Sequence, residues 1–189
     1  GQSYPLCSKA GAAGRAAMIE AGAKALGVEA ASCSVANGEV ISGDEEGRLA
    51  FVAARAGLGL DKGSVVVFDT GGGSSQFTFG HDTSVDERFS VDVGAVRYTE
   101  RFGLDGVVSR DVLREAMQAI ATDLSRLDGR PVPDALAAMG GAVTNLTAVL
   151  HRLAKYDPEV VQGTVLDRAE IDRQIELYRS RDAAARRAI

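Results

Sequence analysis

The sequence predicts an α/β fold, because strand-like and helix-like segments alternate along it. Short apolar runs such as Ser64–Phe68 and Ala135–Met139 have the length of buried strands. Residues 109–126 instead carry apolar side chains three and four positions apart, which is the spacing of one helix face. Strands with intervening helices are expected to pack as layers around a shared core.

The composition is that of an ordinary globular protein. The chain has 189 residues, of which 46% are hydrophobic and 25% are charged. A net charge of −5 gives no indication of a nucleic-acid-binding or membrane-surface protein. No apolar run approaches the roughly 20 residues of a membrane span. The two cysteines lack metal-ligand spacing, so a reducing, cytoplasmic location is expected.

The first third of the chain predicts a helix, the end of a strand and a second helix. Residues 8–27 are rich in Ala, Gly and Lys and are compatible with a helix. Val40 and Ile41 have the character of a strand end. Ser42, followed three residues later by Glu45, has the capping-box pattern that opens a helix.

The apolar stripe of the second helix points to a carboxylate in an unusual position. Its apolar stripe is formed by residues at spacings of three and four, namely Leu49, Val52, Ala53 and Ala56. Extending the stripe back by three residues reaches Glu46, so we expect this side chain to point into a cleft. The alternative is that Glu46 only complements the positive end of the helix dipole.

The central segment Asp69–Gln76 predicts a strand, a glycine-rich turn and a second strand. Gly71, Gly72 and Gly73 have no Cβ, so backbone N–H groups can approach an anion closely. The hydroxyls of Ser74 and Ser75 add donors, and Asp69 can hold a hydrated cation or a water. Together these groups predict a phosphate site with a divalent metal. The alternative is a glycine-rich hairpin that binds no ligand.

The remaining segments predict a third strand at residues 87–93, a short helix from Gly94, a helix at 109–126 and a strand at 135–139. Gly140-Gly141 then precedes a helix at about 143–153, which resembles a second phosphate or nucleotide site. The alternative for this pair of glycines is plain packing. A last strand is expected at 163–166. It is followed by a helix capped by Asp167.

Four blocks of sequence together resemble the exopolyphosphatase/guanosine pentaphosphate phosphatase (Ppx/GppA) family. Residues 41–49 resemble its "ISGxEEAR" helix start, and residues 67–75 resemble its "DxGGGST" loop. Residues 93–100 resemble its "GAVRLTE" segment. Residues 139–144, with Tyr156-Asp157-Pro158, resemble its "GGTVTTL…YDP" region. The blocks follow the family's order over residues 41 to about 180.

The resemblance implies a fold and a domain organisation. The fold is that of the actin/Hsp70/sugar-kinase superfamily, in which ribonuclease-H-like domains with a mixed sheet flanked by helices close on a phosphate cleft. Residues 41–189 resemble the second lobe of the catalytic core. Residues 1–40 match poorly, and nothing matches the family's N-terminal lobe. A fragment of this kind is expected to be inactive or weak in isolation.

The resemblance also implies roles for individual residues. Glu46 matches the catalytic base that activates the attacking water, and Asp69 matches the carboxylate that helps to hold Mg²⁺. The phosphate-binding residues implied by the two glycine-rich sites are Gly71, Gly72, Gly73, Ser74, Ser75, Gly140 and Gly141. Arg15 is a further possible phosphate contact.

Two substitutions depart from the family pattern. Gln76 stands where the family usually has Glu, and an amide can neither act as a base nor neutralise a metal ion. Apyrases, which are related nucleotidases, have Gln at this point. Ala142 stands where the family usually has Thr, which removes one hydroxyl donor from the second glycine site.

The resemblance implies a hydrolase that removes terminal phosphate from inorganic polyphosphate or pppGpp with Mg²⁺. Neither a nucleic acid nor a membrane is an expected partner, and the full-length protein is a possible homodimer. One alternative is an apyrase-like nucleoside di- or triphosphatase. The other is a phosphate- or nucleotide-binding module without catalysis, which Gln76 and the unmatched lobe favour.

Overall fold

The computed structural model describes residues 17–30, 33–36 and 39–189 of the chain. It divides into two compact units, Gly1–Val52 and Ala53–Ile189, and the division falls within helix α2 (Gly43–Leu58). Each unit is described by itself. The boundary that the sequence predicts at residue 40 stays a prediction.

The first unit contains a helix, a small sheet and the beginning of α2. Residues 17–26 are helical, which agrees with the later part of the helix predicted over 8–27. Strands β1 (Cys33–Ala36) and β2 (Glu39–Ser42) pair antiparallel, with Val35 opposite Val40. Helix α2 follows β2 directly, as the capping-box pattern predicts.

The apolar stripe predicted on α2 is wrong. Leu49 and Val52 are 46% and 38% exposed, whereas Phe51, Ala54 and Arg55 are buried. These buried residues also have helical spacing, but with about 3.6 residues per turn they lie on nearly the opposite side of the helix from the predicted stripe. Phe51 has the largest apolar area on the helix, and its burial outweighs that of smaller side chains. The stripe therefore gives no support for the position of Glu46.

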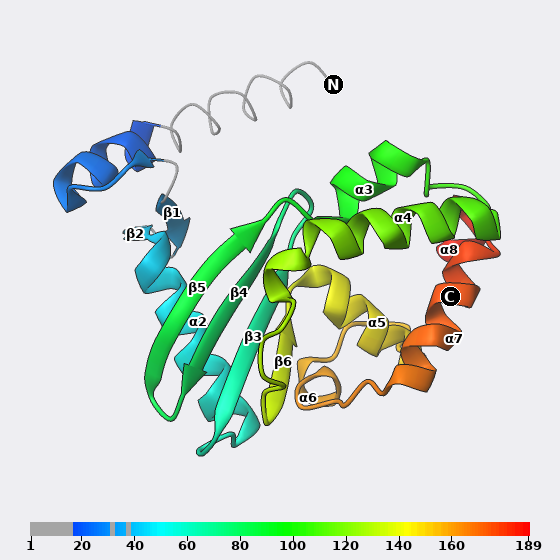
Figure 1. The fold of residues 1–189 in the computed structure, drawn as a ribbon. Coiled ribbons are helices and arrows are strands. Elements are labelled where there is room, and N and C mark those ends of the chain that lie inside the picture. Colours follow the sequence, from blue (N-terminus) through cyan, green and yellow to red (C-terminus); the bar gives the residue numbers. More distant parts are fainter. Residues whose placement is uncertain (1–16, 31–32, 37–38) are drawn as a thin grey trace. The chain divides into compact units, whose positions relative to one another are not determined.

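The second unit is built on a four-stranded mixed sheet with the order β5-β4-β3-β6 (Figure 1). Strands β3 (Ser64–Thr70), β4 (Ser75–His81) and β5 (Ser84–Val91) are antiparallel neighbours joined by short turns. Strand β6 (Ala135–Met139) pairs parallel with β3, which places Asp69 opposite both Gln76 and Met139. The apolar runs in the sequence predicted these strands, with ends that differ by a few residues.

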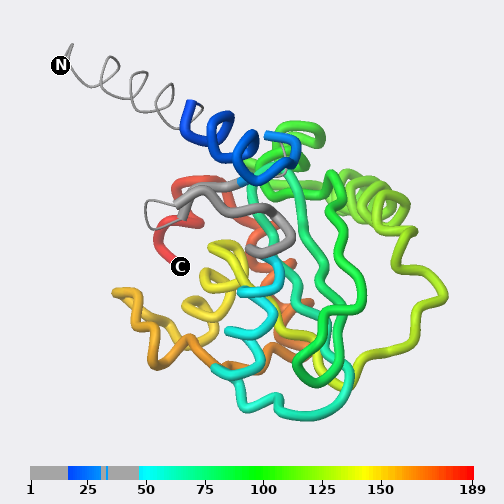
Figure 2. Tube along the Cα trace, turned by 90° about the vertical axis from the view of Figure 1, so that its left-hand side faces the viewer, coloured from blue at the N-terminus to red at the C-terminus, as the bar shows by residue number. Residues whose placement is uncertain are grey.

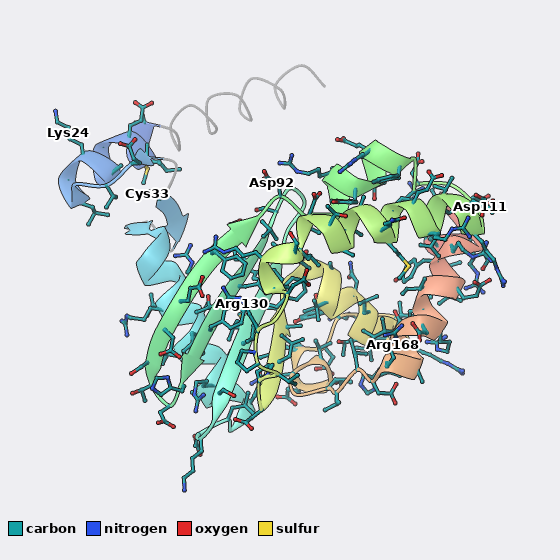
Figure 3. The ribbon with its side chains drawn as sticks, in the orientation of Figure 1. Lys24, Cys33, Asp92, Asp111, Arg130 and Arg168 are labelled. Carbon is teal, nitrogen blue, oxygen red and sulfur yellow. The ribbon has the colours of Figure 1, made fainter. Side chains whose placement is uncertain are left out.

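One face of the sheet carries a cluster of aromatic side chains. Phe77 and Phe89 are buried, and their ring centroids lie 5.6 Å apart, within the range of favourable stacking. The guanidinium of Arg130 lies 4.5 Å from the Phe79 ring and is paired with Glu87 (Figure 3). Hydrogen bonds from Arg130 and Arg126 lower the pKa of Glu87. Charged groups thus cover the edge of this apolar cluster.

Helices lie on both faces of the sheet (Figure 2). Leu124 and Leu127, from the segment after α4, pack on the aromatic face, and α5 lies on the other side of the strands. The helical elements of this unit beyond α2 are α3 (Ala95–Phe102), α4 (Arg110–Asp123), η2 (Ser125–Leu127), α5 (Gly141–His151), α6 (Pro158–Val161), α7 (Arg168–Arg179) and α8 (Ala183–Arg186).

The strand predicted over residues 163–166 is wrong, because this segment is a loop between α6 and α7. Gly163 has φ +76°, outside the strand region. The Thr164 hydroxyl donates to the carbonyl of Val160 at 2.9 Å, which closes a local turn, and Val165 is 84% exposed. The helix after it begins as predicted, with the Asp167 carboxylate accepting from the N–H of Glu170 at 2.8 Å.

Glu170 on α7 is expected to make the free energy of unfolding depend on pH in the acidic range. Hydrogen bonds from Arg173 first and Gln174 second lower its pKa from 4.5 to about 2. A carboxyl whose pKa is depressed by folding contributes stability above its unfolded pKa and loses it as pH falls through its folded pKa. We expect the free energy of unfolding to fall between pH 4.5 and about 2, and Glu170→Gln to flatten that part of the curve.

Urea denaturation at a series of pH values measures this effect. Glu115→Gln, at an exposed glutamate on α4, is the matched control and should leave the pH dependence unchanged. If Glu170→Gln leaves the slope between pH 4.5 and 2 unaltered, the hydrogen bonds of Glu170 do not contribute as described.

Candidate functional site

The glycine-rich loop closes the hairpin between β3 and β4. The N–H of Gly71 donates to the carbonyl of Ser74 at 2.9 Å, so the loop is a tight turn of four residues. Gly71, Gly72 and Gly73 are all exposed, and they present backbone without side chains. The loop predicted from the sequence is therefore present and open to a ligand.

The first turn of α3 fixes the orientation of the loop. The N–H of Ala95 donates to the Gly71 carbonyl at 3.0 Å, and the N–H of Val96 donates to the Gly72 carbonyl at 2.9 Å. Arg97 Nε donates to the Gly73 carbonyl at 2.8 Å. In a trans peptide the C=O and the following N–H point in opposite directions.

Because three successive carbonyls face α3, the N–H groups of Gly72, Gly73 and Ser74 point away from that helix. A row of backbone N–H groups pointing to one side is an anion-binding arrangement. The guanidinium of Arg97 lies 3.3 Å from Asp92, which precedes α3 (Figure 3). Arg97 therefore contacts the loop on the α3 side, opposite to these N–H groups.

Gly94 allows this close approach. A Cβ at this position would lie 2.4 Å from the carbonyl carbon of Gly73 and 2.5 Å from the oxygen of Gly72. Both atoms are backbone, so neither can move aside without displacing the loop. The sequence placed Gly94 at the start of a helix but gave no reason for the residue type.

Ser75 is buried, and its hydroxyl is hydrogen-bonded within the protein. It is 1% exposed, and its hydroxyl lies 2.6 Å from the Val93 carbonyl oxygen and 2.9 Å from Thr70 Oγ1. A hydroxyl has one proton, so Ser75 donates to the carbonyl and accepts from Thr70. The role of Ser75 in binding phosphate stays a prediction, whereas its bonds hold the ends of β3 and β4 to the segment before α3.

Asp69 lies at the carboxyl end of β3, next to the second pair of glycines. Its side chain is exposed at the same sheet edge where β6 ends and α5 begins. A Cβ on Gly140 would lie 2.6 Å from Asp69 Oδ1 and 2.8 Å from the Thr70 carbonyl oxygen. The carboxylate is therefore packed against the backbone at the start of α5.

The N-terminus of α5 adds a second group of donors. Its intrahelical bonding begins with the N–H of Thr144, which donates to the Gly140 carbonyl at 3.1 Å. The preceding N–H groups, of Gly141, Ala142 and Val143, have no backbone acceptor in the described part of the chain. First-turn N–H groups without a backbone acceptor, together with the helix dipole, favour negative charge at this position.

Gln76 faces the same side of the sheet as Asp69, because the two residues are directly paired across β3 and β4. Its side-chain oxygen accepts a hydrogen bond from Arg88 Nη2 at 3.3 Å. The amide group of Gln76 therefore has its NH₂ end turned away from Arg88. Sequence reasoning missed Arg88, since the contact depends on the register between β4 and β5.

The structure brings most of the predicted site residues to one edge. Those that meet there are Asp69, Gly71, Gly72, Gly73, Ser74, Ser75, Gly140 and Gly141. Glu46 lies in the first turn of α2, and its side chain is outside the described part of the structure. Arg15 also lies outside the described residues. The roles of all these residues stay predictions.

The geometry defines an α/β protein in which two groups of backbone N–H donors flank a carboxylate. The sequence match gives this class a family, because the family model "Ppx/GppA phosphatase family" matches residues 19–182. The chain belongs to the Ppx/GppA phosphatase family.

Curated relatives and a solved structure agree with this assignment. Exopolyphosphatase 2 of Mycobacterium tuberculosis is 34% identical over 131 residues, which cover 65% of this chain and 39% of the relative. The bifunctional 3-dehydroquinate synthase/phosphatase of Fusobacterium nucleatum is 29% identical over 143 residues, covering 73% of this chain and 22% of the relative. The Aquifex aeolicus PPX-GPPA enzyme superposes with a TM-score of 0.71 at 28% identity, over 78% of this chain and 48% of that one.

The comparisons confirm the predicted fold, which is the actin-like fold of the Ppx/GppA structures. The chain spans about half the length of the solved relative and less than half of the curated relatives. Across the described ranges, no helix is long and apolar enough to cross a membrane.

Gly140→Ala is expected to disrupt the site and the fold together. Gly140 has φ +96° and ψ 164°, a region that is essentially restricted to glycine, and its new Cβ would press on the Asp69 carboxylate. We expect a loss of about 1–3 kcal/mol in the free energy of unfolding, measured by urea denaturation.

Gly141→Ala is the matched control. Among the described residues, apart from its chain neighbours and the backbone of α5, no atom lies within 4 Å of a Cβ at Gly141, so this change should be neutral or slightly stabilising. Equal stability of the two variants would contradict the close contact between Gly140 and Asp69.

Proposed function

We propose that this protein, at its native length, is a phosphoanhydride hydrolase that removes the terminal phosphate from inorganic polyphosphate or pppGpp. The observation that carries the proposal is the meeting of the glycine loop, Asp69 and the α5 N-terminus at one sheet edge. The printed name of the 34% identical relative, an exopolyphosphatase, supports the same substrate class.

The residues of the site would have two roles, binding of the phosphate and activation of the attacking water. The N–H groups of the loop and of the α5 N-terminus bind the oxygens of the phosphate under attack. Glu46 accepts a proton from the attacking water. Phosphoryl transfer needs mainly positioning and charge neutralisation, so a fixed backbone cradle with one well-placed base is sufficient machinery.

The chemistry of the site fits Mg²⁺. Magnesium is usually bound by one or two carboxylates together with waters and phosphate oxygens. The described residues hold no group of three or more His, Cys, Asp or Glu side chains, so an all-protein cage is not available among them. Asp69, an exposed residue at the carboxyl end of β3, supplies one carboxylate. When bound there, Mg²⁺ would neutralise charge on the phosphate oxygens.

Gln76 favours a second candidate, an apyrase-like nucleoside di- or triphosphatase. Its amide, held by Arg88, places a neutral hydrogen-bond donor beside Asp69 where a second carboxylate would add negative charge. This arrangement suits a site that uses less metal charge. The substrate assay below separates the two candidates.

Glu46→Gln should lower turnover by about 10²–10⁴-fold while leaving phosphate binding intact, because the amide cannot accept the proton of the attacking water. The measurement is phosphate release from polyphosphate, pppGpp and ATP, with and without Mg²⁺, by the protein at its native length. Glu45→Gln, the same change one residue earlier, is the control and should retain activity.

Each outcome of this assay has a distinct meaning. Mg²⁺-dependent release from polyphosphate or pppGpp supports the proposal, and release from ATP alone favours the apyrase-like candidate. Binding without release by the wild-type protein indicates a non-catalytic module. An unchanged rate in Glu46→Gln removes Glu46 from the mechanism.

Gln76→Glu is expected to lower the Mg²⁺ concentration for half-maximal phosphate release by roughly threefold to tenfold, because metal affinity rises with the charge of the ligands. Without metal, the same change should weaken binding of inorganic triphosphate through repulsion. Gln118→Glu makes the same charge change at an exposed position on α4 and is the control. An identical Mg²⁺ requirement in both variants would place Gln76 outside the site.

A further inference from the structure

Helix α3 holds the glycine-rich loop but is itself a short element. It has eight residues, and the N–H groups of the first three, Ala95, Val96 and Arg97, donate to the loop carbonyls at 2.9–3.0 Å. A helix of about two turns is not stable in water without packing against another element. The position of the loop therefore depends on what fixes α3.

Tyr98 attaches α3 to its neighbour α4. It is 3% exposed and is the one buried residue among the eight of α3. Its hydroxyl donates to Oδ2 of Asp123, the last residue of α4, which lies beside α3 (Figure 1). A buried hydroxyl needs a partner, and a carboxylate is a strong acceptor. Tyr98 directly follows Arg97, so this bond is made one residue beyond the part of α3 that holds the loop.

Asp123 occupies a position that α4 alone does not favour. A carboxylate in the last turn opposes the helix dipole, and this turn has no basic residue to offset it. The carboxylate accepts from the Tyr98 hydroxyl and lies 3.5 Å from Nη1 of Arg101. Tyr98 and Arg101 are three residues apart on α3 and so share one face. The contacts of Asp123 thus stabilise the position of α3 rather than α4 itself.

The sheet in turn holds Asp123 in place. Leu124 and Leu127, which follow it, pack on the aromatic face of the sheet. The N–H of Leu124 donates to the Ile120 carbonyl at 2.9 Å, so helical hydrogen bonding continues past Asp123. A continuous path of contacts therefore runs from the sheet through Leu124, Asp123 and Tyr98 to the loop.

We propose that Tyr98 and Asp123 are positioning residues for the glycine-rich loop. Their hydrogen bond fixes α3, and α3 fixes the direction in which the N–H groups of Gly72, Gly73 and Ser74 point. The loop needs this support because glycine has the widest backbone freedom of any residue. Among the described residues neither side chain is hydrogen-bonded to the loop, so both act through α3. Their effect on catalysis rests on the proposed function, whereas their effect on the loop does not.

Amide hydrogen exchange of the whole 189-residue chain, followed by NMR, measures this support. Tyr98→Phe keeps the ring and removes the hydroxyl. We expect the N–H groups of Ala95 and Val96 to exchange about 3- to 10-fold faster, the value of one net hydrogen bond. Amides of β4, which is paired on both sides, report overall unfolding and should change less. Tyr178→Phe is the control, because the Tyr178 hydroxyl has no hydrogen-bond partner among the described residues.

Asp123→Ala tests the same bond from the other side. Alanine is the better helix former and removes the charge that opposes the dipole, so the change should not weaken α4. We still expect faster exchange at Ala95 and Val96, whereas Asp123→Asn keeps an acceptor oxygen and should retain most of the protection. Unchanged exchange at these two amides in either Tyr98→Phe or Asp123→Ala would overturn the proposal. An equal increase in β4 would overturn it as well, because it reports a loss of overall stability.

Kinetics at native length give a second readout. Tyr98→Phe should raise the KM for polyphosphate or pppGpp by about 3- to 10-fold, with the pH profile and the Mg²⁺ requirement unchanged. Misdirected N–H donors weaken phosphate binding, whereas a smaller folded fraction lowers kcat alone. A fall in kcat alone would therefore contradict the positioning role. If the wild type releases no phosphate, the proposed function fails, and the exchange measurement still decides whether Tyr98 and Asp123 position the loop.

Discussion

The conformation of the glycine-rich loop depends on the hydrogen bonds that α3 donates to it. The N-terminal N–H groups of a helix need acceptors, and here the Gly71 and Gly72 carbonyls supply them. The same bonds turn the N–H groups of the loop away from α3, so one set of bonds supplies acceptors to the helix end and orients the loop N–H groups. Helix α3 thereby supports the loop, whereas the first N–H groups of α5 have no backbone acceptor in the described part of the chain.

Parallel pairing of β3 with β6 supplies the other half of the site. It brings Asp69 beside Gly140, and the opposite ends of the strands are joined by Asp134, whose carboxylate accepts from the N–H of Ser64 at 2.8 Å. This bond, with that of the Ser64 hydroxyl, lowers the pKa of Asp134. The strands are thus fixed at both ends, and the carboxylate of the site sits on a rigid element.

The sequence predicted the glycine-rich turn between two strands and the start of a helix after Gly140-Gly141, and both are present in the structure. It predicted the packing around them less well. The stripe on α2 failed because spacing alone ignored Phe51, the largest apolar side chain of the helix. The strand at 163–166 failed because a strand needs a partner. The contact of Arg88 with Gln76 was inaccessible, since it depends on the register of two strands.

The order of the strands has a consequence for how the chain acquires its site. Strands β3, β4 and β5 are joined by local hairpins, whereas Ser64 and Asp134, at the start of β3 and just before β6, are separated by 70 residues. Closing so long a segment costs entropy before its contacts form, and such non-local pairing is slow. The glycine hairpin can therefore form early, but Asp69 meets Gly140 only when β6 docks. In a partly folded chain Asp69 and Gly140 are apart, so bringing the proposed site residues together coincides with completing the sheet.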